Sequence, residues 1–262
     1  MNPGRDRVSA NAPSGYLAPP RPHVVAHRGL VVNAPENSLG AFADALECGA
    51  THIETDVRTS SDGVAVLAHD PDLVRLAGCD SLVRDLTVDQ LCDIDLGGGH
   101  RIATLAQALR AFPDSRFNID IKDAESIDAV ATAVADARAT ARVLITSFSE
   151  ARRRRAVALL PQVATSASAR RFAVALVLAK LGWVGAVRRT LRGLDAVQVP
   201  ERAYTIHIAT RRVIHALRSA GVTVHFWTIN DPIEMRRLFD LGVDGIVTDR
   251  PDLANRLILG IS

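Results

Sequence analysis

Short runs of β-branched and other apolar residues alternate along the chain with longer Ala-, Leu- and Arg-rich stretches whose apolar positions recur at helical spacing. This alternation is typical of repeated βα units and predicts an α/β protein. The segments that match the strand pattern are HVVAHRG from His23, THIETDV from Thr51, VAVLAHD from Val64, RFNIDIK from Arg116, RVLITSF from Arg142, QVATSAS from Gln162, AVQVP from Ala196, VTVHFWTIN from Val222 and GIVTD from Gly245.

One of these segments does not fit a parallel sheet. THIETDV and VAVLAHD are joined only by RTSSDG, which is long enough for an antiparallel hairpin and far too short for a parallel crossover. The remaining strands alternate with helices over about the 250 residues that a (β/α)8 TIM barrel needs. We therefore predict a (β/α)8 barrel with a β-hairpin excursion after the second barrel strand. An open doubly wound sheet is the alternative, but no Gly-rich dinucleotide fingerprint follows the first strand.

Composition limits the classes of function. The chain has 262 residues, 48% of them hydrophobic, which excludes a disordered or collagen-like protein. Its formal charge of +2 gives no strong electrostatic pull toward nucleic acid, and we find no nucleic-acid-binding motif. We interpret the arginine run at residues 152–155 as a solvated helix face. The cysteines Cys48, Cys79 and Cys92 are odd in number and lack metal-type spacing, which favours unpaired thiols in a reducing compartment.

The N-terminal stretch resembles neither a secretory signal nor a membrane anchor. Residues 1–22 have no apolar signal-peptide core, and we expect a flexible leader before one barrel domain at residues 23–262. No uncharged apolar run reaches the length of about 18 residues that a spanning helix needs, so we expect a cytoplasmic protein. The stretch at residues 170–191 has an apolar middle between arginines, which would suit a membrane surface or an active-site cap. We favour a helix packed on the barrel.

Polar residues gather at the C-terminal ends of several predicted strands, in HIETDV, NIDIK, FWTIN and IVTD. A (β/α)8 barrel places its active site at this end. Buried polar side chains on many strands are costly unless they converge on a site. Their convergence is the main functional signal of the sequence.

The carboxylates of this set predict a cation site. Residues two apart in a strand share a face, so Glu54 lies beside Asp56, and Asp120 lies between Asn118 and Lys122. Three carboxylates in one barrel mouth would repel one another without a cation, and oxygen ligands suit Mg²⁺ or Ca²⁺ better than zinc. The alternative is that these acids form salt bridges to arginines on the barrel rim, such as Arg58 or Arg116.

Histidines and fixed positive charge complete the candidate site. His27 and His69 each end a predicted strand, and an imidazole exchanges a proton readily near neutral pH. Arg28 and Lys122 supply the positive charge that a phosphodiester needs as charge builds on its oxygens. A structural role is the alternative for each histidine, and simple neutralisation of Asp120 is the alternative for Lys122. We expect His52, which starts its strand, to lie deep in the barrel or at its lower rim.

At these residues the chain resembles the glycerophosphodiester phosphodiesterase family of metal-dependent (β/α)8 barrels. The resemblance runs from about His23 to the C-terminus and is weak only at about residues 125–220. It rests on HRG from His27, PEN from Pro35, AF from Ala41, GATHIETDV from Gly49, SDGVAVLAHD from Ser61, NIDIK from Asn118 and VHFWTINDPIEMRRLFDLGVDGIVTDRPDL from Val224. Several motifs in this order and spacing make a specific signature.

The resemblance implies a role for each matching residue. His27 and His69 would be the acid–base pair. A divalent Mg²⁺ or Ca²⁺ ion would be held by Glu54, Asp56 and Asp120. The substrate would be held by Arg28, Glu36, Lys122 and Trp227, with Trp227 against its glycerol end. In one departure, the family usually carries glutamate at the position of Asp120.

The implied reaction is the metal-dependent hydrolysis of a small glycerophosphodiester to sn-glycerol 3-phosphate and an alcohol. An alternative places lysophospholipids or other lipid phosphodiesters in the same site, with residues 170–191 as an interfacial helix. A second alternative is a barrel that binds phosphodiesters without turnover.

Overall fold

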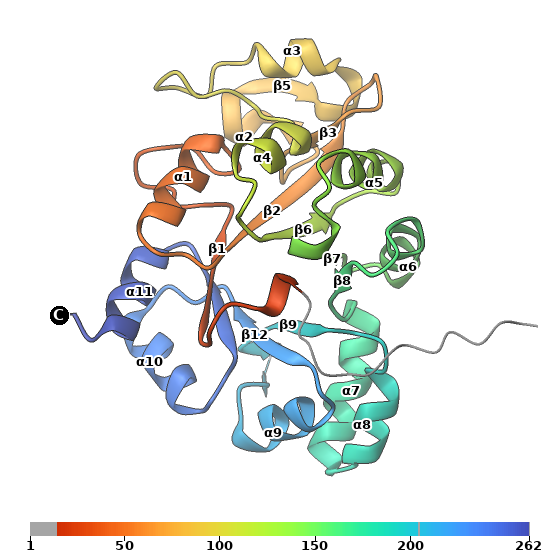
Figure 1. Cartoon of the computed structure of the whole chain (residues 1–262), viewed down its shortest axis with the longest axis vertical. Helices are drawn as coiled ribbons and strands as arrows, with labels where there is room; N and C mark the ends of the chain where they lie inside the picture. Colours follow the sequence, from red (N-terminus) through yellow and green to blue (C-terminus); the bar gives the residue numbers. More distant parts are fainter. Residues whose placement is uncertain (1–14, 204, 262) are drawn as a thin grey trace, which may run out of the picture.

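The computed structural model describes residues 15–203 and 205–261, and at its centre parallel strands form a barrel (Figure 1). The neighbours along the sheet are β8, β7, β6, β2, β1, β13, β12 and β9, and a parallel bridge between Ser166 and Ala196 joins its two ends. The predicted (β/α)8 barrel is therefore confirmed. Its strands are β1 (His23–His27), β2 (His52–Thr59), β6 (Phe117–Ile121), β7 (Val143–Thr146), β8 (Ala164–Thr165), β9 (Ala196–Pro200), β12 (Thr223–Trp227) and β13 (Gly245–Thr248).

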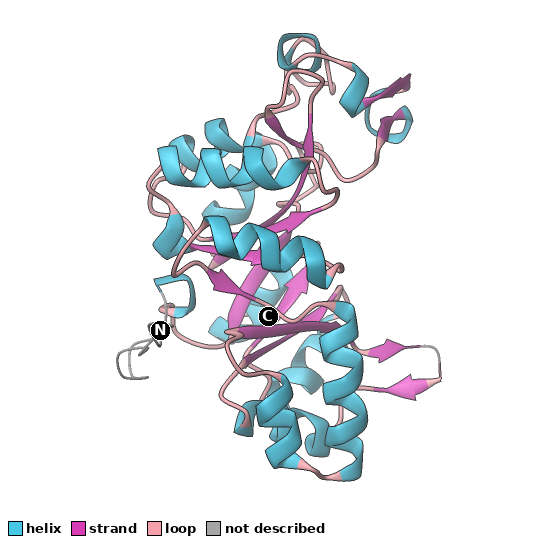
Figure 2. Ribbon diagram, turned by 90° about the vertical axis from the view of Figure 1, so that its right-hand side faces the viewer, coloured by secondary structure: helices cyan, strands magenta, loops and turns pink. Residues whose placement is uncertain are grey.

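Helices surround the strands, as Figure 2 shows. Helix α9 illustrates why they pack there: it buries Val213, Ile214 and Leu217 toward the barrel and leaves Arg211 and Arg212 exposed. The surrounding helices are α1 (Leu39–Glu47), α4 (Leu105–Ala111), α5 (Ser126–Asp136), α6 (Glu150–Leu159), α7 (Ala169–Leu181), α8 (Val184–Thr190), α9 (Arg211–Ser219), α10 (Pro232–Asp240) and α11 (Pro251–Leu259).

The segment after β2 leaves the barrel. Strand β3 (Ala65–Leu67) pairs antiparallel with β2, so that Leu67 lies opposite Val57. Residues 68–103, here called the insertion, then form a small unit with an apolar cluster of its own, at the top of Figure 1. Its elements are β4 (Asp72–Leu73), α2 (Val74–Ala77), β5 (Cys79–Leu82), the 3-10 turn η2 (Val83–Asp85) and α3 (Val88–Cys92). The sequence pattern did not predict these short elements.

Residues 15–22, which we expected in the flexible leader, pack against the N-terminal end of the barrel. The 3-10 turn η1 (Gly15–Leu17) places Tyr16 in a fully buried position. His52 Nε2 donates a hydrogen bond to the carbonyl oxygen of Tyr16 at 2.8 Å, because a carbonyl can only accept. A second strand-start histidine, His23, likewise donates from Nε2 to the carbonyl oxygen of Pro19 at 3.1 Å. The rest of the expected leader, residues 1–14, lies outside the described residues.

His52 lies at the lower end of the barrel, as expected, in a cluster of buried histidines. His23 Nδ1 accepts from His225 Nε2 at 3.0 Å, because His23 Nε2 already carries the proton that it donates to Pro19. Gln198 in turn donates to His225 Nδ1 at 3.3 Å. This network requires neutral imidazoles. Burial agrees with it, since it lowers the pKa of His52 to about 3 and lowers the pKa values of His23 and His225.

Two further expectations from the sequence concern the outer helices. The stretch at residues 170–191 forms α7 and α8, which break at Gly182 and pack on each other and on α9. The interpretation of residues 152–155 as a solvated face is wrong for Arg153, which is 4% exposed and bonds to Glu150 and Thr165. None of the helices described is long and apolar enough to cross a membrane.

The remaining short elements connect the barrel units. The 3-10 turn η3 (Thr140–Arg142) precedes β7. Strands β10 (Arg202–Ala203) and β11 (Ile206–His207) form an antiparallel ribbon after β9 that projects from the barrel (Figure 2).

Candidate active site

The HRG motif forms a tight turn at the C-terminal end of β1. Arg28 has a φ of 59° and Gly29 a φ of 93°, both in the left-handed region. A Cβ at Gly29 would lie 2.7 Å from the backbone of Ala41, so this position also needs glycine for space. The turn aims the backbone N–H of Arg28 at Glu54 Oε2, at 3.1 Å.

The PEN motif lines the same mouth. Asn37 adopts a φ of 57°, a region that asparagine tolerates, and its N–H donates to the carbonyl oxygen of Arg28 at 2.9 Å. Its side chain donates from Nδ2 to Asp56 Oδ2 at 3.2 Å and accepts at Oδ1 from the hydroxyl of Thr55 at 2.8 Å. Asn37 was missing from the predicted site residues, although the motif that contains it was recognised.

The three predicted carboxylates lie together at the strand ends. Strands β2 and β6 pair so that Glu54 is opposite Asn118 and Asp56 is opposite Asp120. Glu54, Asp56 and Asp120 are 7%, 1% and 6% exposed, respectively. The sequence prediction of a convergent, buried acidic cluster is thus reproduced by the fold.

Two basic side chains neutralise part of this cluster. Lys122 Nζ lies 2.7 Å from both Asp56 Oδ1 and Asp120 Oδ2. Arg28 Nε lies 2.9 Å from Asp56 Oδ2. The alternative pairing with Arg58 or Arg116 is wrong, because Arg58 contacts His69 and Asp123, and Arg116 donates to the carbonyl oxygen of Gly15.

The remaining acidic charge is not balanced. Burial raises the pKa of Asp56, but Lys122 and Arg28 outweigh this effect and hold that pKa below its usual value. Burial and the neighbouring Asp56 raise the pKa of Glu54 to about 8. Burial also raises the pKa of Asp120, despite the contact with Lys122. Among the described residues, no ion pair supplies a cation to Glu54.

A divalent cation fits this imbalance. Asn118 Oδ1 is buried without a hydrogen-bond partner, on the residue opposite Glu54. Buried carboxylate and amide oxygens are the ligands that hard cations prefer. In the described parts of the chain, however, no three His, Cys, Asp or Glu side chains are arranged as a ready metal site, and the ammonium of Lys122 lies between Asp56 and Asp120. These oxygen ligands therefore suit a cation that balances the charge of Glu54 and takes over some of the contacts that Lys122 makes to Asp56 and Asp120.

A carboxylate orients His27. His27 Nδ1 donates to Asp249 Oδ1 at 2.7 Å, and Asn230 Nδ2 donates to the other oxygen of Asp249 at 2.6 Å. The bond at Nδ1 leaves Nε2 as the reactive nitrogen. Burial lowers the pKa of His27, but Asp249 and Glu54 outweigh it and raise that pKa overall. Neither Asp249 nor Asn230 was among the predicted site residues, although both lie in the strand ends FWTIN and IVTD that we singled out.

His69 is also held by a neighbouring carboxylate. Its Nδ1 contacts Asp70 Oδ1 at 2.7 Å, and its carbonyl oxygen accepts from Arg58 Nε at 2.9 Å. Asp70 also contacts Arg75 of α2, at 2.6 Å. Arg75 extends to the predicted substrate residue Glu36, which in turn contacts Arg28 at 3.2 Å.

Two aromatic side chains form an apolar part of the site. The ring of Trp227, at the end of β12, meets the ring of Phe148 edge to face, with centroids 6.3 Å apart. Phe148 follows β7 and is 65% exposed. The sequence predicted Trp227 here but not Phe148.

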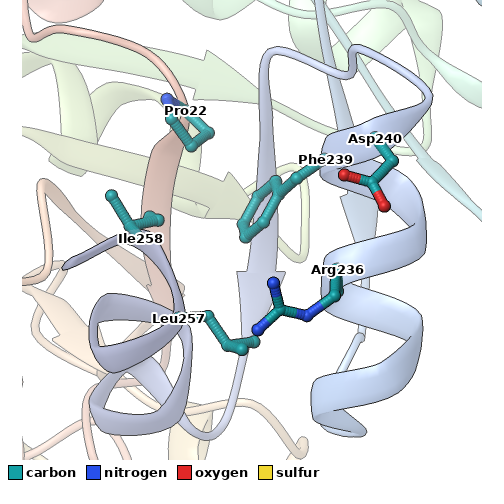
Figure 3. A pocket seen from close by; sticks show the side chains of 6 residues that line it. All are labelled: Pro22, Arg236, Phe239, Asp240, Leu257 and Ile258. Atoms are coloured by element: carbon teal, nitrogen blue, oxygen red, sulfur yellow. The ribbon is translucent and has the colours of Figure 1, made fainter. Parts of the chain in front are cut away.

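A separate cavity of about 220 Å³ lies at the opposite end of the barrel (Figure 3). It opens between α10, α11 and the segment that precedes β1, and none of the predicted site residues lines it. Its walls are Pro22, Arg236, Phe239, Asp240, Leu257 and Ile258.

Carboxylate-bonded histidines, buried acids and basic side chains lie at the C-terminal ends of the barrel strands, where (β/α)8-barrel enzymes carry their active sites. The fold and this site define the molecule as a (β/α)8-barrel enzyme. The model of the glycerophosphoryl diester phosphodiesterase family matches residues 27–253. The chain belongs to this family and is a phosphodiesterase that hydrolyses glycerophosphodiesters. The family is generally dependent on a divalent metal ion.

Individual relatives agree with this assignment. The chain is 41% identical over 237 residues to a Mycobacterium tuberculosis protein named "Probable glycerophosphodiester phosphodiesterase 2", with 90% of each chain covered. A crystal structure of the Agrobacterium tumefaciens glycerophosphodiester phosphodiesterase is 28% identical, has a TM-score of 0.73, and is matched over 89% of this chain and 98% of its own. The Thermotoga maritima enzyme is 30% identical with a TM-score of 0.72, over 89% and 97% of the two chains.

Proposed function

We propose that His27 and His69 carry out the acid–base steps of phosphodiester hydrolysis. The observation that supports this most is their arrangement: each imidazole is fixed through Nδ1 by its own aspartate, beside the Glu54–Asp56–Asp120 cluster. An imidazole held through Nδ1 presents Nε2 to the substrate in one orientation. The two histidines are therefore suited to act as proton donor and proton acceptor for one substrate.

The contact with Asp249 favours His27 as the acid. Burial lowers the pKa of His27, but the hydrogen bond to Asp249 and nearby carboxylate charge outweigh burial and raise that pKa above its usual value. This favours the protonated form that a general acid needs, and we assign this role to His27. His69 then takes the proton of the attacking hydroxyl as the oxygen–phosphorus bond forms. Attack by water gives sn-glycerol 3-phosphate directly, whereas attack by the glycerol hydroxyl gives a cyclic phosphate that a water molecule must open in a second step. As the bond from phosphorus to the leaving oxygen breaks, His27 Nε2 gives its proton to that oxygen. One proton is taken and one is given, so the step balances.

The basic residues hold the phosphate. Burial lowers the pKa of Lys122, but Asp120 and Asp56 raise it overall, so Lys122 stays charged and its ammonium is available to a phosphoryl oxygen. Arg28, positioned by Glu36, supplies a second donor. Trp227, with Phe148 against it, packs on the glycerol end of the substrate.

Glu54, Asp56 and Asp120 are the residues that would hold the divalent ion. When bound, Mg²⁺ or Ca²⁺ supplies fixed positive charge to the phosphate oxygens. The unpaired Asn118 Oδ1 and the raised pKa of Glu54 support a cation at this place.

A small glycerophosphodiester is the substrate that we propose. In support, the related Oleispira antarctica phosphodiesterase, 24% identical with a TM-score of 0.74 over 90% of this chain and 96% of its own, was solved in complex with sn-glycerol 3-phosphate as product. The test is a turnover panel of glycerophosphocholine, glycerophosphoethanolamine and lysophosphatidylcholine, each with Mg²⁺, Ca²⁺ or excess chelator. We expect metal-dependent release of sn-glycerol 3-phosphate from the first two. Preferential turnover of lysophosphatidylcholine in micelles would favour the lipid alternative, binding without turnover would favour the non-catalytic one, and full activity in chelator would contradict the metal proposal.

A further inference from the structure

Arg75 links the two halves of the site from outside the barrel. It lies on α2, which belongs to the insertion and not to the barrel itself. Its guanidinium makes two bonds of 2.7 Å to the two oxygens of Glu36, from Nη1 and Nη2. Its Nε donates to Asp70 Oδ2 at 2.6 Å. One guanidinium thus satisfies two carboxylates of the site at the same time.

Each of these carboxylates orients a functional side chain. The second oxygen of Asp70 fixes His69 Nδ1, and Glu36 contacts Arg28 Nη1 at 3.2 Å. Arg28 continues the chain of contacts to Asp56. Arg75 therefore lies at the centre of an array that runs from the predicted base to the predicted phosphate-binding arginine and the buried acids.

Arg75 makes more contacts, and more directional ones, than an arginine in an ordinary surface ion pair. Arg75 is 51% exposed, and a single exposed pair contributes little. A two-pronged guanidinium contact fixes direction as well as distance, and here it is shared with a second carboxylate. Glu36 and Asp70 are 16% and 28% exposed, and Arg75 contributes to holding both of their pKa values below the usual range. Without Arg75, both acids would lose a group that fixes their direction.

We propose that Arg75 is a positioning residue that fixes His69, through Asp70, and Arg28, through Glu36, in their reactive orientations. This inference rests on the roles proposed above for His69 and Arg28. It means that the insertion completes the active site from outside the barrel.

The test compares Arg75→Ala, Arg75→Lys and Arg84→Ala on glycerophosphocholine. Arg84 is the matched control, an arginine of the same insertion that is 79% exposed and lies 3.9 Å from Asp85. We expect Arg75→Ala to lower kcat by ~10-fold or more, because misorientation of acid–base and phosphate-binding groups has effects of this size. Arg75→Lys should recover only part of the loss, since one ammonium lacks the fork that reaches both carboxylates. Arg84→Ala should keep the wild-type kcat.

A simple tethering of the insertion by Arg75 would also lower activity, and guanidinium ion separates the two roles. Added guanidinium at ~10 mM can rebuild the contacts to Glu36 and Asp70, but it cannot tether α2 to the barrel. We expect it to restore the kcat of Arg75→Ala several-fold and to leave wild type and Arg84→Ala unchanged. A wild-type kcat in Arg75→Ala would overturn the inference, as would a loss that guanidinium does not relieve.

His69→Ala, measured beside these variants, separates failure of this inference from failure of the proposed function. If His69→Ala is as active as wild type, the proposed role of His69 is wrong. If His69→Ala is impaired while Arg75→Ala is not, only the inference about Arg75 is wrong.

Discussion

Replacing Glu54 by glutamine removes a charge that the metal-free fold accommodates poorly. The carboxyl is buried at the mouth of the barrel, beside Asp56, and its pKa is raised from 4.5 to about 8. In the unfolded chain the same group ionises near 4.5. Between these values the folded state binds the proton and the unfolded state does not, so the free energy of unfolding falls as pH rises. The glutamine variant keeps the acceptor for Arg28 N–H and loses this dependence.

The size of the effect follows from the pKa difference. Each pH unit inside this window changes the free energy of unfolding by ~1.4 kcal/mol. The slope is slightly smaller at pH 5 and pH 7, where one of the two states is partly titrated, so between these pH values Glu54→Gln should gain about 2.5 kcal/mol of stability relative to wild type. The buried histidines at the lower end of the barrel, His23, His52 and His225, have the same surroundings in both proteins, so their contribution cancels in the difference.

The assay is urea unfolding of both proteins at pH 5, 6 and 7 in excess chelator. Glu125→Gln is the control, because Glu125 is an exposed carboxylate at the start of α5 whose side chain makes no capping bond. We expect the difference between Glu54→Gln and wild type to grow with pH, and the difference for Glu125→Gln to stay flat. A difference for Glu54→Gln that does not change with pH would refute the argument that Glu54 lacks a compensating cation.

Three further predictions follow from the same geometry. On a p-nitrophenyl phosphodiester, whose leaving group needs no proton, His27→Ala should lose much less activity than on glycerophosphocholine. If His69→Ala shows this smaller loss instead, the roles of the two histidines are exchanged. Asp120→Glu should stay active and shift the ratio of Mg²⁺- to Ca²⁺-supported turnover, because the two ions differ in bond length and geometry, whereas Asp120→Asn should lose most activity with either ion. Wild-type behaviour of Asp120→Asn would remove it from the ligand set and make Glu36 the first candidate to replace it. His52 is neutral in the folded protein but protonated in the unfolded chain below pH 6.5, so acid destabilises the fold. In urea unfolding, His52→Gln should therefore lose about 2 kcal/mol less stability than wild type between pH 7 and pH 5. Equal losses would contradict the neutral histidine network.

The strand pattern was enough to predict the barrel and the shared face of its acids. Alternation of period two places Glu54 beside Asp56 and Asp120 beside Lys122 without any knowledge of the fold. The barrel then brings these strand ends together, so the candidate cluster was predictable from local rules and one topology.

Contacts between distant segments were not predictable in this way. Nothing local to Asp249 shows that it bonds to His27, and nothing local to Arg75 shows that it bonds to Glu36. Tyr16 lies in a Pro- and Ser-rich stretch that looks like a leader, yet the open end of the barrel gives it a site to fill. Arg153 is buried because Glu150 and Thr165 bond to its guanidinium, a pairing that depends on how α6 sits against β8.

The central claim, that two aspartate-oriented histidines at the barrel mouth hydrolyse the phosphodiester, is tested most directly by one measurement. Release of sn-glycerol 3-phosphate from glycerophosphocholine is followed at saturating Mg²⁺ or Ca²⁺ for wild type, His27→Ala and His69→Ala, with circular dichroism to confirm that each variant is folded. We predict that both variants lose about 100-fold or more in kcat while keeping the wild-type spectrum. Near-wild-type turnover by either folded variant would contradict the claim for that histidine.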